Sequence, residues 1–166
     1  MTVELRNYRI DVAEQFTRLR NHPVIWDNGY DKVPNPFTVA DAQTFIQLQL
    51  DKTPAHRQLI YWNNQLVGEI GINKNSDVFR LSAEMGYFIG KPFWGKGIAT
   101  KAIQLMVDYT FRHFDILRIE AGVFDFNKAS MRVLEKNGFY LESIKRRAVF
   151  KNGKILDDYV WVKLRK

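Results

Sequence analysis

The most constraining stretch of this sequence is GYFIGKPFWGKGIATKAIQLM, residues 86–106, where two glycines separate an apolar run from a helical pattern. Glycine costs backbone entropy in strands and helices, so Gly95 and Gly97 at this junction indicate a special turn or a close ligand. The apolar residues that follow recur at helical spacing: Ile98, Ala102, Leu105, Met106 and Tyr109. The stretch therefore predicts a strand, a glycine loop and an amphipathic helix in that order.

A helix that begins in glycines is suited to binding an anion. The N-terminus of a helix has free N–H groups and the positive end of the helix dipole, and glycine lets a phosphate reach them. Lys96 adds a positive charge and Thr100 a hydroxyl. The spacing fits neither a P-loop nor a dinucleotide-binding fingerprint, in which a third glycine would replace Thr100. A turn that needs positive φ is the purely structural alternative.

Composition excludes several classes of protein. The chain has 166 residues, 46% of them hydrophobic, which predicts one folded domain over residues 1–166. It has no cysteine, and its three histidines (His22, His56 and His113) lack ligand spacing, so no metal site is expected. With neither a signal peptide nor a membrane-spanning run, we expect a cytoplasmic protein. The net charge of +7 favours anionic partners, but the absence of a nucleic-acid-binding motif disfavours DNA or RNA.

Strand and helix patterns alternate along the chain. Capping-box pairs at Asp11/Glu14 and at Thr38/Asp41 predict two early helices, and the segment 24–37 between them has the composition of a loop. Asn127 and Gly138 bracket a late helix. Strand patterns occupy residues 2–9, 57–62, 65–72, 79–89, 117–124, 139–151 and 154–164, with turns at 63–64 and 152–153. These patterns predict a sheet of six or seven strands with helices on its faces.

Two blocks resemble the GNAT superfamily of N-acyltransferases. WGKGIAT is similar to the family's pyrophosphate loop, Gln/Arg-x-x-Gly-x-Gly/Ala, with Gly97 and Ala99 at the last two positions. Trp94 stands where the family has Gln or Arg, as in the branch of ribosomal-protein N-terminal acetyltransferases (RimJ/RimL-like). The second block, NKASMRVLEKNGF at 127–139, looks like the family's later motif. The resemblance covers essentially the whole chain.

The resemblance implies a fold, a donor and a binding mode. The expected α+β fold is a mixed, mostly antiparallel sheet with helices on both faces and a splayed central strand pair, formed by residues 82–90 and 117–124. Acetyl-CoA would be the acyl donor, with its pantetheine in the gap beside Phe88, Ile89 and Gly90. Its diphosphate would lie on the amides of Trp94, Gly95, Lys96, Gly97, Ile98, Ala99 and Thr100. Asn127 and Ser130 would reach the pantetheine; plain helix capping is their alternative role.

The implied reaction is direct attack of a neutral amine on the thioester in a ternary complex. Many family members place a tyrosine where this chain has Leu134, to protonate the thiolate, so Ser130 is the nearest candidate here. Glu84, in the middle of a strand, is the candidate base. Glu69 and Glu120 also interrupt apolar strands and remain alternatives, and a strand glutamate that only faces solvent is the structural explanation.

The acceptor amine is less constrained. Trp26, Tyr30 and Phe37, in the loop after the first helix, are the expected acceptor-binding residues. Arg146 and Arg147 make a basic rim, which argues against polyamines. We expect a protein N-terminus or a small primary amine. A non-catalytic acyl-CoA sensor and a basic nucleic-acid-binding module are the alternative functions, and the oligomeric state stays open, a homodimer included.

Overall fold

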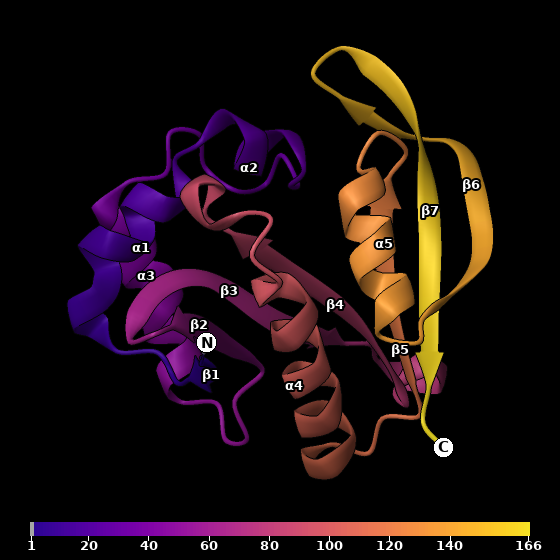
Figure 1. The fold of residues 1–166 in the computed structure, drawn as a ribbon, viewed down its shortest axis with the longest axis horizontal. Helices are drawn as coiled ribbons and strands as arrows, with labels where there is room; N and C mark the ends of the chain where they lie inside the picture. The colour runs from indigo at the N-terminus through magenta and orange to yellow at the C-terminus, as the bar shows by residue number, and fades with distance from the viewer. Residues whose placement is uncertain (1) are drawn as a thin grey trace.

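The computed structural model describes residues 2–166 and contains one seven-stranded mixed sheet in the order β1-β2-β3-β4-β5-β7-β6 (Figure 1). Every neighbouring pair is antiparallel except β4 and β5, which are parallel. The strands are β1 (Val3–Arg6), β2 (Arg57–Trp62), β3 (Gln65–Lys74), β4 (Ser82–Ile89), β5 (Arg118–Phe124), β6 (Tyr140–Lys151) and β7 (Lys154–Leu164). The predicted mixed, mostly antiparallel sheet is confirmed.

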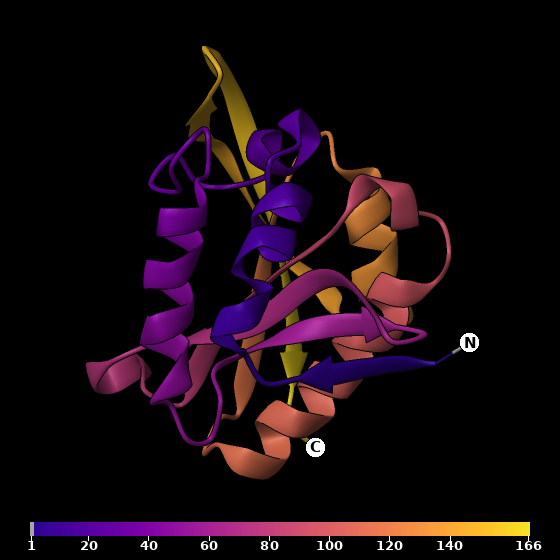
Figure 2. The same cartoon turned by 90° about the vertical axis from the view of Figure 1, so that its left-hand side faces the viewer.

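Helices cover both faces of the sheet, as expected (Figure 2). They are α1 (Ala13–Arg20), α2 (Pro23–Asp27), α3 (Val39–Leu50), α4 (Ile98–His113) and α5 (Lys128–Lys136), with short 3-10 turns at η1 (Ile10–Val12), η2 (Asp77–Phe79) and η3 (Lys91–Phe93). Two separate hydrophobic clusters result. One packs α4 and α5 against one face of the sheet, and the other packs α1 and α3 against the opposite face.

The helix starts test the capping predictions. Thr38 caps α3 with a complete capping box, because its side chain accepts from the Asp41 amide and the Asp41 carboxylate accepts from the Thr38 amide. The box predicted at Asp11 and Glu14 is wrong. Asp11 lies inside η1, and its carboxylate accepts hydrogen bonds from the Arg9 guanidinium, so α1 begins without a side-chain cap.

The segment 24–37 is not wholly a loop, since Pro23–Asp27 forms α2. Proline at the first position of a helix has no N–H to leave unsatisfied, and the His22 ring accepts a hydrogen bond from the Val24 amide. The two predicted hairpins are confirmed: Asn63 and Asn64 have positive φ between β2 and β3, and Asn152 and Gly153 do between β6 and β7.

The centre of the sheet opens between its two parallel strands. β4 pairs with β5 only over Ser82–Glu84 against Arg118–Glu120, although β4 continues to Ile89 and β5 to Phe124. Beyond Glu84 the two strands separate, and Figure 1 shows them diverging toward the end of the molecule that carries α2. The predicted splay is therefore present, and the glycine loop follows the diverging end of β4.

Candidate active site

The glycine loop presents bare backbone at the N-terminus of α4. Gly95 and Gly97 have φ of +73° and +75°, and a Cβ added at either residue would meet no atom within 4 Å. Within residues 2–166, no carbonyl or side chain accepts a hydrogen bond from the backbone amides of residues 95–100. These free amides lie at the positive end of a 16-residue helix, which is the arrangement that binds a diphosphate.

The Trp94 side chain has a structural role at the position where the family pattern has Gln or Arg. Its indole N–H donates to the Ile89 carbonyl at 2.7 Å, which ties the start of the loop to the last residue of β4. The Lys91 ammonium lies 4.7 Å from the Trp94 ring centroid. Trp94 thus fixes the loop through its side chain and leaves the amides beyond it free.

The backbone of β4 offers the gap a defined set of peptide groups. At the two ends of the β3–β4 ladder, Asn75 donates to the Ser82 carbonyl and Gly90 donates to the Val67 carbonyl. Peptide groups of an antiparallel strand alternate in direction, so even-numbered residues of β4 bond to β3 and odd-numbered residues face β5. The predicted pantetheine contacts at Phe88 and Gly90 are therefore turned toward β3, whereas Tyr87 and Ile89 turn their peptide groups toward the gap.

The side chains of Tyr87 and Ser130 meet across the gap. Ser130 lies in the first turn of α5, where its amide donates to the Asn127 side chain, and its hydroxyl oxygen is 2.5 Å from that of Tyr87. Burial raises the pKa of Tyr87, so its hydroxyl stays protonated. Sequence reasoning missed Tyr87, because a tyrosine in an apolar strand gives no local signal. Leu134, at the position where the family resemblance implies a tyrosine, is fully buried in the core.

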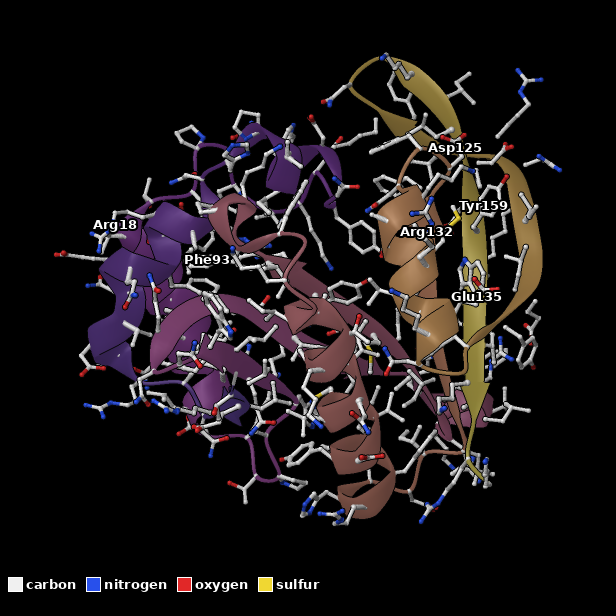
Figure 3. All side chains as sticks on the ribbon, viewed as in Figure 1. Arg18, Phe93, Asp125, Arg132, Glu135 and Tyr159 are labelled. Atoms are coloured by element: carbon white, nitrogen blue, oxygen red, sulfur yellow. The ribbon has the colours of Figure 1, made fainter. Side chains whose placement is uncertain are left out.

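Asn127 also reaches toward the loop around α2. Its side-chain amide donates to the Asn28 side chain at 2.9 Å while its oxygen caps α5. In Figure 3, the labels Arg132 and Glu135 mark α5, the helix that Asn127 caps, and the label Phe93 marks the connection between β4 and α4. Asn127 therefore connects the element predicted to hold the cofactor to the loop predicted to hold the acceptor.

Glu84 points to the opposite face of the sheet from Tyr87. Its neighbours Ala83 and Met85 are buried against α4, so the alternation of side chains turns Glu84 toward the α1–α3 face. The Tyr30 hydroxyl donates to the Glu84 carboxylate at 2.5 Å. Burial, followed by the hydrogen bond and charge of Glu84, raises the pKa of Tyr30, which keeps it a donor.

Two more carboxylates lie close to Glu84. Glu120 is its register partner on β5, and Asp158 on β7 has its carboxylate against Gly122. Burial and the negative charges of Glu84 and Glu120 raise the pKa of Asp158, although Lys145 opposes them. Glu120 is paired with Arg118 at 2.9 Å, so Glu84 is the carboxylate here that faces a neutral partner.

Glu69 has a structural role, as the centre of a buried ion-pair cluster. It is 2% exposed, accepts a hydrogen bond from the Tyr8 hydroxyl, and lies 3.1 Å from the Arg57 guanidinium and 3.7 Å from that of Arg20. Burial alone would oppose its ionisation, but these partners outweigh burial and lower the pKa of Glu69. An ionised carboxylate held by two arginines inside the core is poorly placed to accept a proton from a substrate, which leaves Glu84 and Glu120.

The predicted acceptor-binding residues have different surroundings. Tyr30 is 51% exposed and contacts Glu84, whereas Trp26 contacts the β6–β7 hairpin through Asn152, and the Lys151 ammonium lies 3.4 Å from its ring centroid. Phe37 is 7% exposed and packs its ring against Phe16 in the core. The loop residues that remain available to a ligand are thus Tyr30 and part of Trp26.

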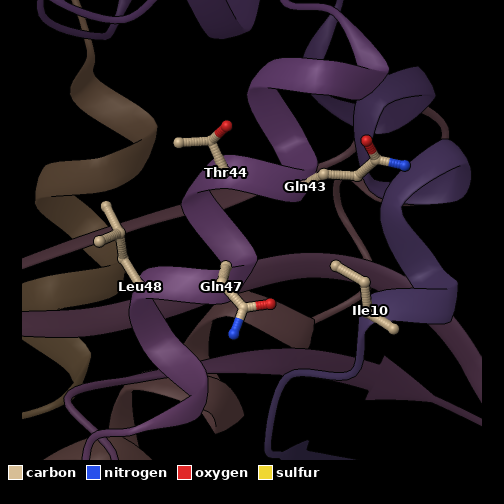
Figure 4. Close-up of a pocket in the computed structure, with 5 residues that line it drawn as sticks. All are labelled: Ile10, Gln43, Thr44, Gln47 and Leu48. Carbon is tan, nitrogen blue, oxygen red and sulfur yellow. The ribbon is translucent and has the colours of Figure 1, made fainter.

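Two surface depressions are lined by residues other than Glu84, Tyr87 and Ser130. One, of about 500 Å³, is a shallow groove between η1 and α3 lined by Ile10, Gln43, Thr44, Gln47 and Leu48 (Figure 4). The other, of about 370 Å³, lies between α4 and the end of α5 and is lined in part by Thr100, Asn137 and Lys163. Across residues 2–166, no cluster of three or more potential ligands could hold a metal ion, and no helix could cross a membrane.

Comparison with known proteins identifies the family of this chain. The family model described as "Acetyltransferase (GNAT) domain" matches residues 2–140. The chain belongs to the GNAT acetyltransferase family. A relative, the probable N-acetyltransferase YjcK of Bacillus subtilis (strain 168), is 44% identical over 151 residues, which cover 90% of this chain and 78% of YjcK.

Solved GNAT structures share the whole fold. RimL, a ribosomal-protein acetyltransferase solved with coenzyme A, has a TM-score of 0.86 at 22% identity, covering 99% of this chain and 94% of that one. The microcin self-immunity acetyltransferase MccE, solved with acetyl-CoA and AMP, has a TM-score of 0.82 at 24% identity, covering 98% and 92%. The expected family is confirmed, and this GNAT protein is an acyltransferase that takes acetyl-CoA as its donor.

Proposed function

We propose that this GNAT acetyltransferase transfers the acetyl group to a primary amine by direct attack, without a covalent enzyme intermediate. One observation carries the proposal: the two sets of polar groups lie on opposite faces of one gap in the sheet. The glycine loop, Tyr87 and Ser130 are on the α4–α5 face, whereas Glu84 and Tyr30 are on the α1–α3 face. A donor and an acceptor that enter from opposite faces meet in line between β4 and β5.

The donor is held mostly by backbone. The amides of residues 95–100 bind the diphosphate. The Tyr87 peptide groups and the Ile89 N–H pair with the pantetheine as an added strand would, whereas the Ile89 carbonyl accepts from the Trp94 indole. We also propose that the N–H groups of Tyr87 and Ile89 stabilise the developing oxyanion. Fixing both reactants in line contributes the largest share, since well-oriented pairs recover ~7–11 kcal/mol of barrier.

Glu84 is the proposed general base. An amine that arrives as an ammonium ion must lose a proton before it attacks, and the Glu84 carboxylate lies at the point where β4 and β5 separate. The hydrogen bond from Tyr30 holds this carboxylate in place from the acceptor side.

The acceptor is proposed to be a cationic primary amine, either a protein N-terminus or a small amine. Glu84, Glu120 and Asp158 concentrate negative charge beside the gap, which attracts an ammonium group. The basic rim expected from the sequence is weaker than its residue count suggests, because Arg146 is paired with Asp157 at 2.9 Å. The argument against polyamines is therefore weaker, and polyamines belong among the acceptors to test.

Thiol release from acetyl-CoA tests this function directly. We expect release to depend on an added amine when the protein is given peptides with free N-termini, amino acids, or polyamines such as spermidine, and mass spectrometry should find the acetyl group on the amine. Acetyl-CoA binding without acetylation of any of these amines would favour the sensor, the second candidate function. A cytoplasmic location and a homodimer remain predictions.

Changing Glu84 to glutamine should lower kcat by about 100-fold or more, the usual contribution of a positioned acid or base. The amide is nearly isosteric and still accepts from Tyr30, so acetyl-CoA affinity measured by calorimetry should not change. Glu120→Gln is the matched comparison, because Glu120 is the register partner on β5 and is already paired with Arg118. A larger loss of kcat in Glu120→Gln than in Glu84→Gln would assign the base to Glu120.

A further inference from the structure

The Tyr87–Ser130 pair joins the two sides of the gap between β4 and β5. Tyr87 comes from β4, beyond the last residue paired with β5, and Ser130 from the first turn of α5, which follows β5. Their oxygen atoms are 2.5 Å apart although the residues are 43 positions apart in sequence. The proposed pantetheine path runs from the glycine loop past Ile89 toward Glu84, and it passes this pair.

The breaking of the thioester places negative charge on the same face as the pair. As the amine nitrogen bonds to the carbonyl carbon, the C–S bond breaks and its electron pair goes to sulfur. The sulfur belongs to the pantetheine arm, which in the proposed function enters from the α4–α5 face, where Tyr87 and Ser130 lie. Among the described side chains, this pair supplies hydroxyl donors from both walls of the gap.

The hydrogen bond between the two residues has a preferred direction. Either hydroxyl can donate at this distance, but a phenol is a better donor than an aliphatic alcohol, so donation from Tyr87 to the Ser130 oxygen is the favoured direction. The proton of Ser130 is then free to point away from Tyr87. Ser130 is held from a second direction, because its amide donates to the Asn127 side chain and its backbone is fixed in α5.

We propose that Tyr87 is a positioning residue for acetyl transfer: it orients the Ser130 hydroxyl, which donates a hydrogen bond to the sulfur as the C–S bond breaks. This inference rests on the proposed function. The amine proton goes to Glu84, the thiolate leaves stabilised by Ser130, and solvent protonates it after release. Tyr87 on β4 and Ser130 on α5 together thereby provide a hydrogen-bond donor to the sulfur, which the leucine at position 134 cannot provide.

Tyr87→Phe, Ser130→Ala and the double variant test the proposal. Ser130→Ala should lower kcat roughly tenfold to a hundredfold, the effect of losing a hydrogen bond to a charged group. Tyr87→Phe leaves the Ser130 hydroxyl unoriented and should lower kcat by up to the same factor. Neither change should alter acetyl-CoA affinity. The double variant should lose little more than Ser130→Ala alone, because both residues act through one hydroxyl. Tyr140→Phe is the matched control, since Tyr140 is 46% exposed on β6 and should keep the wild-type kcat.

A second measurement needs no acceptor. Ultraviolet difference absorbance of the thiolate gives the pKa of the thiol of bound coenzyme A, and Tyr87→Phe and Ser130→Ala should both raise it. Because this titration works even when no tested amine is acetylated, failure of the proposed function and failure of this inference are distinguishable. A Tyr87→Phe protein with lowered thermal stability but unchanged thiol pKa and kcat would overturn the inference, as would additive losses in the double variant.

Discussion

Gly97→Glu is expected to abolish acetyl-CoA binding in a protein that still folds. A Cβ added at Gly97 would meet no atom within 4 Å, so the side chain starts in open space, but it places a carboxylate beside the free amides of residues 95–100. That carboxylate repels the diphosphate and competes with it for the same N–H groups. Calorimetry with acetyl-CoA should detect no binding, and circular dichroism should match the wild type.

Gly153→Glu is the control for Gly97→Glu. Gly153 also has positive φ, +74°, and open space around it, but it lies in the β6–β7 turn. Both variants therefore carry the same added charge and the same backbone strain at a left-handed position. Retention of acetyl-CoA binding by Gly153→Glu and its loss by Gly97→Glu would locate the diphosphate; unchanged affinity in Gly97→Glu would refute the loop assignment.

Glu69→Gln is expected to destabilise the fold by about 3–5 kcal/mol, the usual cost of removing one partner from a buried ion pair. The amide would leave Arg57 and Arg20 without a counter-charge in a site where the carboxylate is 2% exposed. Urea denaturation measures the loss. Glu142→Gln breaks an exposed ion pair with Arg118 and should cost no more than about 1 kcal/mol. Equal losses in the two variants would contradict this account of Glu69.

The pH dependence of stability follows from the same residue. The pKa of Glu69 is lower in the fold than its ordinary value of 4.5, so its contribution is complete above that value. The contribution disappears as the pH falls through the lowered value and the carboxylate is protonated. Wild-type protein should therefore lose stability on acidification more steeply than Glu69→Gln, which has no carboxylate to protonate at this position.

The sequence by itself determined the features that depend on near neighbours. The glycine loop before α4, the capping box at Thr38 and the Asn152–Gly153 hairpin were all predictable, because a few adjacent residues set the backbone angles and the local hydrogen bonds. The capping pair at Asp11 failed for a related reason. Arg9, two residues away, competes for the same carboxylate, and no local rule ranks the two partners.

Only the tertiary structure distinguished the three strand glutamates. Glu69, Glu84 and Glu120 have similar sequence contexts. In the fold, Glu69 pairs with Arg57 and Arg20. Glu84 accepts from Tyr30, and Glu120 pairs with Arg118. The Tyr87–Ser130 bond likewise joins elements 43 residues apart. The period of a strand assigns side chains to alternate faces, but which residues meet across a gap depends on how the strands and helices pack.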